Sequence, residues 1–595
     1  MGLAARENIG VMEVRDVCEI LAPLALEPPD LEMLRPTEAS YTCLLLQPSG
    51  PIFAGRDRIG GLDQDVNGQK ALAFARLANE RGAHLAVAPE YFTPWSAVRS
   101  LIGQGVVPRP GALWVLGCES IHQDELAQFK GDVAHSCEVL YEPCDALAAD
   151  RPLLDPVVLL FATKRTDGIS RLVALVQFKT HPSRDHLFFE EGLLKRGTAV
   201  YRFRGVCGTL STVTLICSDA FAIDDALVRD LVDRSTIIHI QLNPDPRNSV
   251  YRQYRKTAFD LDSRVSDCHI LCLNWARTVI QHDDDGKTEI WPAVGCSTWY
   301  CPEDACAQTD DIVLPNHHLG LYYTHMKERR HALLFDYDEA VFECRVPKVV
   351  TRGQAVLANK NGPNPLVRYE WDNNESAWVA QSEPRKADFD QVLSIDAGAT
   401  TALANQELDN VLNIERLLAL SAGAINGQDG WHSLKNIDSF GIGSDEIVRR
   451  ITVAQDTSES AEEFRHARLA VVAHIRHELD TRPTWPPQIA GTDKNAQIKW
   501  DVGTGHFNIR CADGKPELIC YLGETPTHRV LENVPSMLTD LLRRSNSPHQ
   551  NRLCVLYRRY GELKFAQLPV TRFDDALMDQ RDILSANTDD STEQI

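Results

Sequence analysis

Residues 215–221 read Leu-Ile-Cys-Ser-Asp-Ala-Phe, and they join a predicted strand to a predicted helix. The strand is the apolar, β-branched run 210–216, and residues 224–232 have helical spacing with acidic residues in the first turn. Cys217, between them, is a candidate nucleophile, because a thiol near the positive end of a helix is favoured as the thiolate. Alone the cysteine is a weak signal, since most free cysteines are small apolar core residues.

Two other apolar strands end in charged residues. Residues 82–92 form a predicted strand that ends in proline followed by Glu90, and residues 172–181 form one that delivers Lys179. In open α/β sheets the active-site groups collect at the carboxyl ends of the strands. A Glu, a Lys and a Cys that each close an apolar strand therefore predict one shared active site.

The chain order of these three residues resembles the Glu-Lys-Cys triad of the carbon-nitrogen hydrolase, or nitrilase, superfamily. The resemblance covers about residues 41–346, and its other segments are the opening strand 41–47, the helix 69–81, Phe178-Lys179-Thr180-His181, the segment 263–274 that ends in Asn, and the Gly-x-Ser strand 295–299. Ser218 departs from the aromatic residue common after the nucleophile. The second acidic residue of many members could here be Glu190 or Glu191.

This resemblance implies covalent catalysis at a carbon bonded to nitrogen. Cys217 would attack an amide carbonyl or a nitrile carbon, Glu90 would act as general base, and Lys179 would hold positive charge against the oxyanion. Further candidates for oxyanion or substrate binding are Ser218, Tyr91, Glu190, Glu191 and Asn243.

Two other motifs do not predict sites. Cys296, Cys301 and Cys306 precede His317-His318, but they lack the close Cys-x-x-Cys pair of many zinc sites, so we interpret them as structural. Residues 350–595 also lack a Ser-Gly-Gly nucleotide motif, which argues against a fused glutamine-dependent NAD synthetase. No metal and no other cofactor is expected.

Length and charge restrict the class of protein. With 595 residues the chain can form two or more domains. Because its formal charge is −22, general electrostatic binding to nucleic acid or anionic membranes is not expected. The start lacks the apolar core of a signal peptide, and no run of about 18 apolar residues occurs. Sixteen cysteines without a small-domain disulfide pattern fit a reducing compartment, so a cytoplasmic protein is expected.

The predicted fold class is α/β, and by resemblance a nitrilase-like four-layer αββα sandwich, followed by a smaller α+β domain. The breaker cluster 359–365 indicates a linker. Helical patterns at 408–422 and 460–479, followed by short alternating runs, indicate an α+β domain with a small antiparallel sheet. The predicted parts are an N-terminal arm 1–40, a nitrilase-like domain 41–350, a linker 351–399, an accessory domain 400–582 and a disordered tail 583–595.

Three functions remain open at this point. The first is hydrolysis of a non-peptide carbon-nitrogen bond in an amide or nitrile, through a thioester or thioimidate. The second is amide-forming acyl transfer, in which an amine replaces water. The third is an effector or scaffold of a multi-protein assembly, for example in bacterial defence, regulated through a C-terminal domain that binds a protein partner or ligand. The resemblance also implies a small-molecule substrate and a homo-oligomer, a dimer or higher.

Overall fold

The computed structural model divides the chain into two compact units, the first mostly up to Lys386 and the second mostly from Ala387 onward. The residues that the structure describes are 12–37, 39–143, 151–183, 190–206, 208–223, 225–232, 234–244, 251, 268–291, 297–302, 310–326, 330–348, 363–382, 392–394, 396–404, 406, 410–424, 451–452, 459–500, 506–544 and 547–569. Within them, no helix is both long and apolar enough to cross a membrane.

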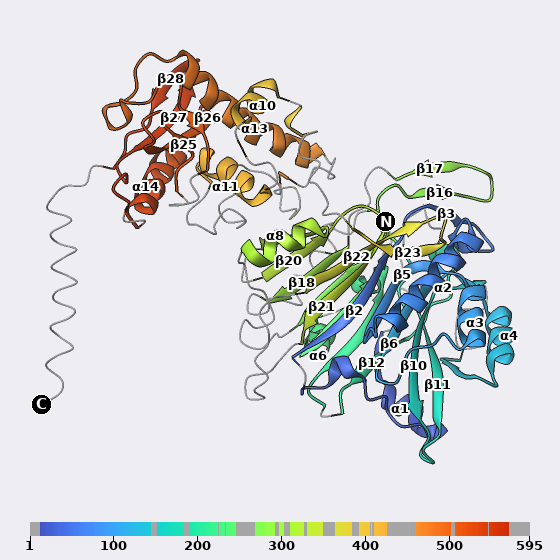
Figure 1. Cartoon of the computed structure of the whole chain (residues 1–595). Helices are drawn as coiled ribbons and strands as arrows, with labels where there is room; N and C mark the ends of the chain where they lie inside the picture. Colours follow the sequence, from blue (N-terminus) through green and yellow to red (C-terminus); the bar gives the residue numbers. More distant parts are fainter. Residues whose placement is uncertain are drawn as a thin grey trace, which may run out of the picture. The chain divides into compact units, whose positions relative to one another are not determined.

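A nine-stranded sheet forms one half of the first unit (Figure 1). Its strands run in the order β23 (Ala377–Ala380), β22 (Asn364–Asp372), β21 (Ala340–Pro347), β2 (Ser40–Gln47), β5 (Leu85–Thr93), β6 (Leu113–Cys118), β10 (Pro156–Lys164), β11 (Ser170–Phe178) and β8 (Cys137–Tyr141). The central strands β2, β5 and β6 are parallel, and every residue of β5 is buried. Burial on both faces explains why this strand is a continuous apolar run instead of an alternating one.

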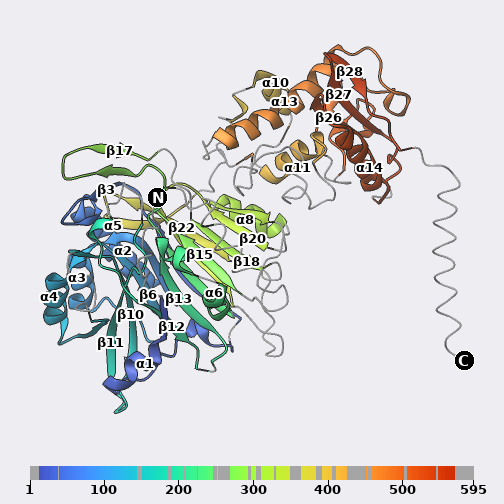
Figure 2. The same ribbon diagram turned by 180° about the vertical axis from the view of Figure 1, so that it is seen from behind.

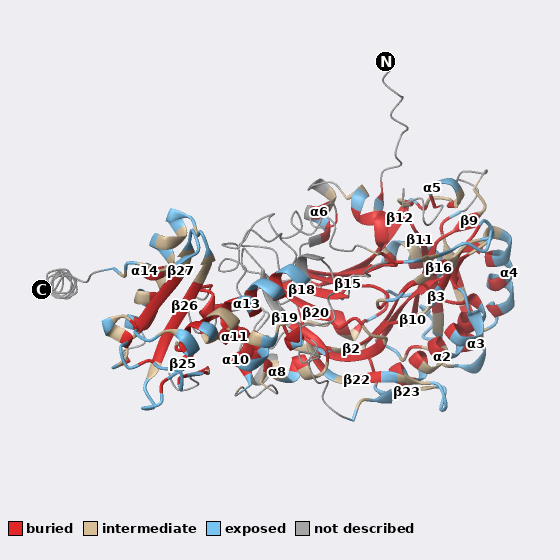
Figure 3. Cartoon of the chain, turned by 90° about the horizontal axis from the view of Figure 1, so that it is seen from above, coloured by how far each residue is buried: buried red, intermediate tan, exposed pale blue. Residues whose placement is uncertain are grey.

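An eight-stranded sheet forms the other half. Its order is β1 (Glu13–Asp16), β12 (Ala199–Arg204), β13 (Ser211–Ile216), β14 (Ser235–Ile240), β15 (His269–Leu273), β18 (Thr298–Pro302), β20 (Arg330–Phe335) and β19 (Leu321–Met326). The strands β13, β14 and β15 are parallel. The two sheets meet through edge-to-face ring contacts, Phe161 with Phe203 at 5.3 Å and Phe335 with Phe342 at 4.8 Å between ring centres. The buried ribbons of both sheets are visible in Figure 3.

Helices cover the outer faces. The helices α2 (Gln64–Glu80), α3 (Trp95–Gln104) and α4 (Gln123–Val133) lie beside the nine-stranded sheet (Figure 2), and α6 (Asp225–Val232) packs on β14 of the other sheet. The Asp63 side chain caps α2 by accepting a hydrogen bond from the Val66 amide. Smaller elements are α1 (Val17–Leu21), η1 (Ala22–Leu24), η2 (Glu32–Leu34), β3 (Pro51–Ala54), β4 (Ile59–Gly61), β7 (Ile121–His122), β9 (Leu153–Leu154), α5 (Glu190–Leu193), η4 (Cys217–Ala222), β16 (Ile280–His282), β17 (Thr288–Ile290) and α8 (Asp310–His318).

The second unit combines helices with a five-stranded sheet. The helices are α10 (Ala397–Leu403), α11 (Val411–Ser421), α13 (Glu459–Thr481), η9 (Pro487–Ile489) and α14 (His528–Arg544); the strands, in sheet order, are β24 (Gln497–Ile498), β25 (Ile509–Arg510), β26 (Pro516–Glu524), β27 (Leu553–Arg559) and β28 (Glu562–Phe565). The pair β26 and β27 is parallel, with α14 as the connection between them. The sheet is therefore mixed, not the small antiparallel sheet that the alternating runs suggested.

The mixed α/β class is confirmed, but two predicted boundaries are wrong. Residues 364–380 were assigned to the linker 351–399, whereas they form β22 and β23 at the edge of the nine-stranded sheet. Residues 13–16, assigned to the N-terminal arm 1–40, form β1 and pair with β12. The strands β10 and β11 pair as an antiparallel hairpin. The tail 583–595 lies outside the described residues.

One glycine allows the strand that carries Glu90 to approach its neighbour. A Cβ at Gly117 in β6 would lie 2.2 Å from the Pro89 carbonyl oxygen and 2.7 Å from the Glu90 nitrogen. We expect Gly117→Ala to lower the free energy of unfolding in urea by about 1–3 kcal/mol, because backbone must move to admit the methyl group. Gly131→Ala is the control, since nothing lies within 4 Å of a Cβ there. Equal stability of the two variants would contradict the prediction.

Candidate active site

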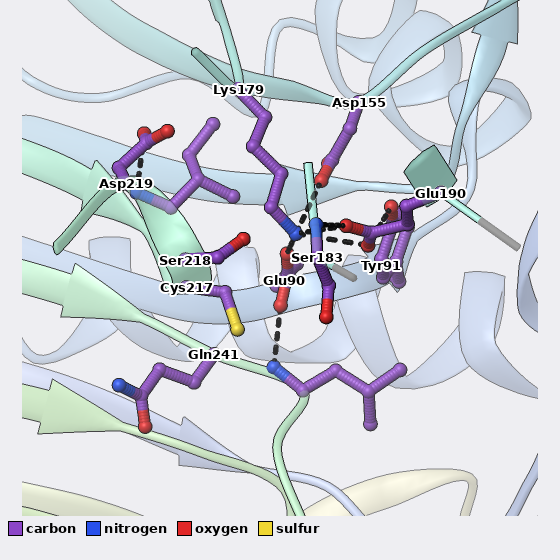
Figure 4. Close-up of polar contacts among 12 residues, drawn as sticks. Glu90, Tyr91, Asp155, Lys179, Ser183, Glu190, Cys217, Ser218, Asp219 and Gln241 are labelled. Carbon is purple, nitrogen blue, oxygen red and sulfur yellow. Dashed lines mark hydrogen bonds and ion pairs between the residues drawn. The ribbon is translucent and has the colours of Figure 1, made fainter. Parts of the chain in front are cut away.

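Three strand ends of the two sheets bring the predicted residues together. Glu90 lies near the end of β5, Lys179 directly follows β11, and Cys217 directly follows β13. The Lys179 Nζ lies 2.7 Å from Glu90 Oε1. The exposed fractions of Glu90, Lys179 and Cys217 are 1%, 1% and 6%. Figure 4 shows the Cys217 sulfur on the side of the Glu90 carboxylate.

A tight turn presents Cys217. Its φ is +40°, in the left-handed region that residues other than glycine rarely adopt. Asp219, fully buried, holds this turn: one carboxylate oxygen accepts from the Ile216 amide at 3.0 Å, and the other accepts from the Thr180 and His181 amides at 2.7 and 3.0 Å. Because Thr180 and His181 follow Lys179, Asp219 ties the turn of the cysteine to the end of the lysine strand.

Glu90 is fixed by both its side chain and its backbone. Its Oε2 accepts a hydrogen bond from the Leu242 amide at 2.6 Å, and its carbonyl oxygen accepts from Trp275 Nε1 at 2.9 Å. The next residue, Tyr91, has a φ of +60°. A carboxylate held in this way keeps one oxygen on the lysine and the other beside Leu242, so its position does not depend on a bound substrate.

The sequence left two candidates for the second acidic residue, and the structure places Glu190 in the site. Both Glu190 oxygens lie within 2.9 Å of Lys179 Nζ, and the carboxylate also accepts from the Tyr91 hydroxyl at 2.8 Å and the Ser183 amide at 2.6 Å. Glu191 is exposed. Tyr91 therefore helps to orient Glu190.

Ser218 and Asn243 take part in the framework around the triad. The Ser218 hydroxyl donates to the His181 carbonyl oxygen. The Asn243 amide donates to Asn274 Oδ1 at 3.0 Å, and Asn274 Nδ2 donates back to the Asn243 carbonyl at 2.8 Å. This pair fixes the backbone next to Leu242, whose amide binds Glu90.

The sequence analysis missed Asp155. Its Oδ2 lies 3.5 Å from Lys179 Nζ, and its carbonyl oxygen accepts from the Lys179 amide at 2.9 Å. The register of the hairpin could have revealed it, because Pro156 pairs with Phe178 and residue 155 therefore lies opposite residue 179. The site thus contains three carboxyl groups, Glu90, Asp155 and Glu190, which we call the carboxylate cluster.

The carboxylate cluster has the composition of a cation site, and the lysine supplies the cation. One oxygen of each of the three groups lies within 4.8 Å of the others, a spacing that could hold a metal ion. Lys179 Nζ already contacts all three groups at 2.7, 2.8 and 3.5 Å. A metal ion here would have to displace that ammonium. Of the cysteines proposed as structural, Cys296 and Cys306 lie outside the described residues.

Burial sets the protonation states. Burial lowers the pKa of Lys179, but the Glu190 and Glu90 carboxylates outweigh it and hold that pKa well above its usual value, so the ammonium persists at neutral pH. Burial raises the pKa of Glu90 against the opposing effect of Lys179. Burial, and to a smaller extent the Glu90 charge, also raises the pKa of Cys217 well above its usual value. The expectation of a resting thiolate is therefore wrong: the six-residue 3₁₀ turn after Cys217 does not overcome desolvation.

Comparisons with known proteins found similarity to solved structures, at low sequence identity and low TM-score. No protein-family model and no curated protein matches the chain. Among solved structures, a mutant amidase of Nesterenkonia AN1 from the nitrilase superfamily is 14% identical, with 44% of this chain and 82% of that chain covered and a TM-score of 0.26. A glutamine-dependent NAD+ synthetase from Acinetobacter baumannii is 13% identical (72% and 62% covered, TM-score 0.26), and the C. elegans NitFhit protein is 13% identical (44% and 55% covered, TM-score 0.25). The chain thus spans less than two thirds of the last two. At such TM-scores the function has to be argued from the site itself.

The raised pKa of Cys217 gives a labelling prediction. At pH 7 iodoacetamide should modify the exposed Cys18 before Cys217, and the Cys217 rate should rise as the pH increases, because only the thiolate is alkylated. Tyr251→Phe should slow Cys217 further, since the Tyr251 hydroxyl lies 3.4 Å from its sulfur and favours the thiolate. Mass spectrometry of timed samples measures both rates. Cys217 labelled faster than Cys18 at pH 7 would contradict the assignment.

Removing the buried cation should destabilise the first unit. Lys179→Met leaves the carboxylate cluster without its partner, and we expect a loss of about 3–5 kcal/mol in the free energy of unfolding at pH 7. The loss should shrink at pH 5, because the carboxyl groups left behind are then protonated more readily. Lys195→Met, which removes a hydrogen bond to Gln123, is the control. A loss that does not change with pH would count against this electrostatic account.

Proposed function

We propose that the chain is an enzyme of the nitrilase superfamily that cleaves a non-peptide carbon-nitrogen bond of an amide or nitrile, with the first unit as a four-layer αββα catalytic domain. The observation that carries the proposal is the buried contact of Lys179 with Glu90 beside the strained turn of Cys217. Buried charges and a left-handed cysteine both cost stability, and such costs are typical of active sites.

In the proposed reaction, Cys217 Sγ attacks the carbonyl carbon of an amide while Glu90 accepts the thiol proton. The raised pKa of Glu90 suits a base for a thiol that is protonated at rest. Lys179, together with the Ser218 backbone N–H, stabilises the negative oxygen of the tetrahedral intermediate. Glu90 then passes its proton to the departing nitrogen, and the carbon-nitrogen bond breaks to leave a thioester.

The second half of the reaction uses the same groups. Glu90 takes a proton from a water molecule, which attacks the thioester carbon, and the proton returns to the leaving sulfur of Cys217 as the acid is released. A nitrile would react in the same way through a thioimidate, with water added before ammonia leaves. Glu190 would keep Lys179 in place during both halves, because it binds the ammonium through both oxygens.

Acyl transfer remains the second candidate, since an amine in place of water would give an amide from the same thioester. A scaffold alone would not require an ammonium and three carboxyl groups in a buried site, so we favour the enzyme. The second unit would then bind a protein partner or ligand, and a cytoplasmic homo-oligomer stays part of the proposal.

An activity screen tests the proposal. The full chain should release ammonia or amine from members of a panel of small amides and nitriles, and added hydroxylamine should yield a hydroxamate if acyl transfer occurs. Cys217→Ala should abolish turnover, and Glu90→Gln should lower kcat by about 10²–10⁴-fold, because the base serves both half-reactions. Cys18→Ala, an exposed cysteine, is the control. Full activity of Cys217→Ala would overturn the proposal.

A further inference from the structure

Asp155 is the member of the carboxylate cluster that the proposed reaction does not use. It is 1% exposed and lies directly before β10. Figure 4 shows its carboxyl group pointing toward Lys179, Glu90 and Glu190. Its 3.5 Å distance to Lys179 Nζ is longer than the 2.7 Å of Glu90 and the 2.8 Å of Glu190.

Among the described residues, none donates a hydrogen bond to either oxygen of Asp155, and the Lys179 ammonium lies 3.5 Å from Oδ2. By contrast, Glu90 accepts from Lys179 and from the Leu242 amide, and Glu190 accepts from Lys179, the Tyr91 hydroxyl and the Ser183 amide. A buried carboxylate without donors is strongly disfavoured and takes up a proton instead. The Asp155 carboxyl group is therefore expected to carry a proton.

The charges of the neighbouring groups lead to the same result. Within the described part of the chain, the titratable groups that face Asp155 are Glu90 from β5, Cys118 from β6, Glu190 from α5, Lys179 after β11, and the hydroxyl of Tyr91 on Glu190. If all three carboxyl groups were ionised, one ammonium would face three negative charges, and all four of these side chains are buried. Burial, and to a smaller extent the Glu90 charge, raises the pKa of Asp155 well above its usual value.

We propose that Asp155 is protonated at neutral pH and donates a hydrogen bond to the Glu90 carboxylate, so that the two groups form a pair that holds one proton at rest. Asp155 is then a positioning residue that keeps Glu90 ionised beside Lys179. When Glu90 takes the Cys217 proton the pair holds two protons, and it returns to one when the leaving nitrogen is protonated. This role in turnover rests on the proposed function, whereas the proton on Asp155 does not.

Infrared spectroscopy of the full chain, labelled with carbon-13 at the aspartate carboxyl carbon, tests the proton directly. At pH 7 we expect the carbonyl-stretch band of a protonated carboxylic acid that shifts with the label and is lost in Asp155→Asn. Asp336→Asn should keep that band, because Asp336 is buried against the Arg368 guanidinium and is expected to be ionised. A band that survives in Asp155→Asn, or no such band in the unmodified chain, overturns the proposal whether or not the chain hydrolyses amides.

The pH dependence of Cys217 alkylation by iodoacetamide tests the hydrogen bond to Glu90. In Asp155→Ala, Glu90 loses its donor and its pKa should rise. A protonated Glu90 no longer opposes the Cys217 thiolate, so a rise of about one pH unit should make alkylation of Cys217 up to about tenfold faster near pH 7. In Asp155→Asn the amide can donate the same bond, and the rate profile should stay. Because an amide cannot ionise, this rescue shows that Asp155 acts as a neutral donor. Profiles of all three chains that superimpose would overturn the pairing with Glu90.

Discussion

The Lys179 ammonium is the interaction on which the rest of the site depends. Its side chain is 1% exposed, and the charge is stable there because Glu90 and Glu190 contact it at 2.7–2.9 Å. Removing an ion from water costs several kcal/mol, and close partners with further hydrogen bonds must offset that cost. The same contacts join β5, the end of β11 and α5, so the requirement to neutralise one buried charge also fixes the positions of the side chains around Lys179.

This arrangement favours a protonated thiol at Cys217 over a thiolate. A thiolate on Cys217 would add a further negative charge to a buried site that already contains three carboxyl groups and one ammonium. The pKa shifts of Cys217 and Glu90 are both upward, and both have burial as their main cause. In the proposed reaction, a nucleophile that stays neutral until a substrate arrives couples loss of its proton to bond formation, and it limits reaction with stray electrophiles.

The convergence of Glu90, Lys179 and Cys217 could be predicted from the sequence because each of them closes an apolar strand, and the ends of such strands converge. Asp155 has no such signal, since a single Asp before a proline looks like a turn residue. The strands β22 and β23 were hidden by Pro365, which pairs with Cys344 where the register of β21 and β22 shifts, a setting that tolerates a residue without an amide donor. The four residues of β1 are too few to show an alternating pattern. Protonation states depend on burial, which local sequence patterns do not report.

The place of β22 and β23 in the nine-stranded sheet has a consequence for how the protein can be shortened. A chain that stopped near residue 350 would expose the full length of β21, an eight-residue strand with seven buried residues, as an open edge. Unpaired apolar edges recruit strands from other molecules and drive aggregation. A recombinant version of the first unit should therefore continue past Ala380, so that the short outer strand β23 remains as the natural border of the sheet.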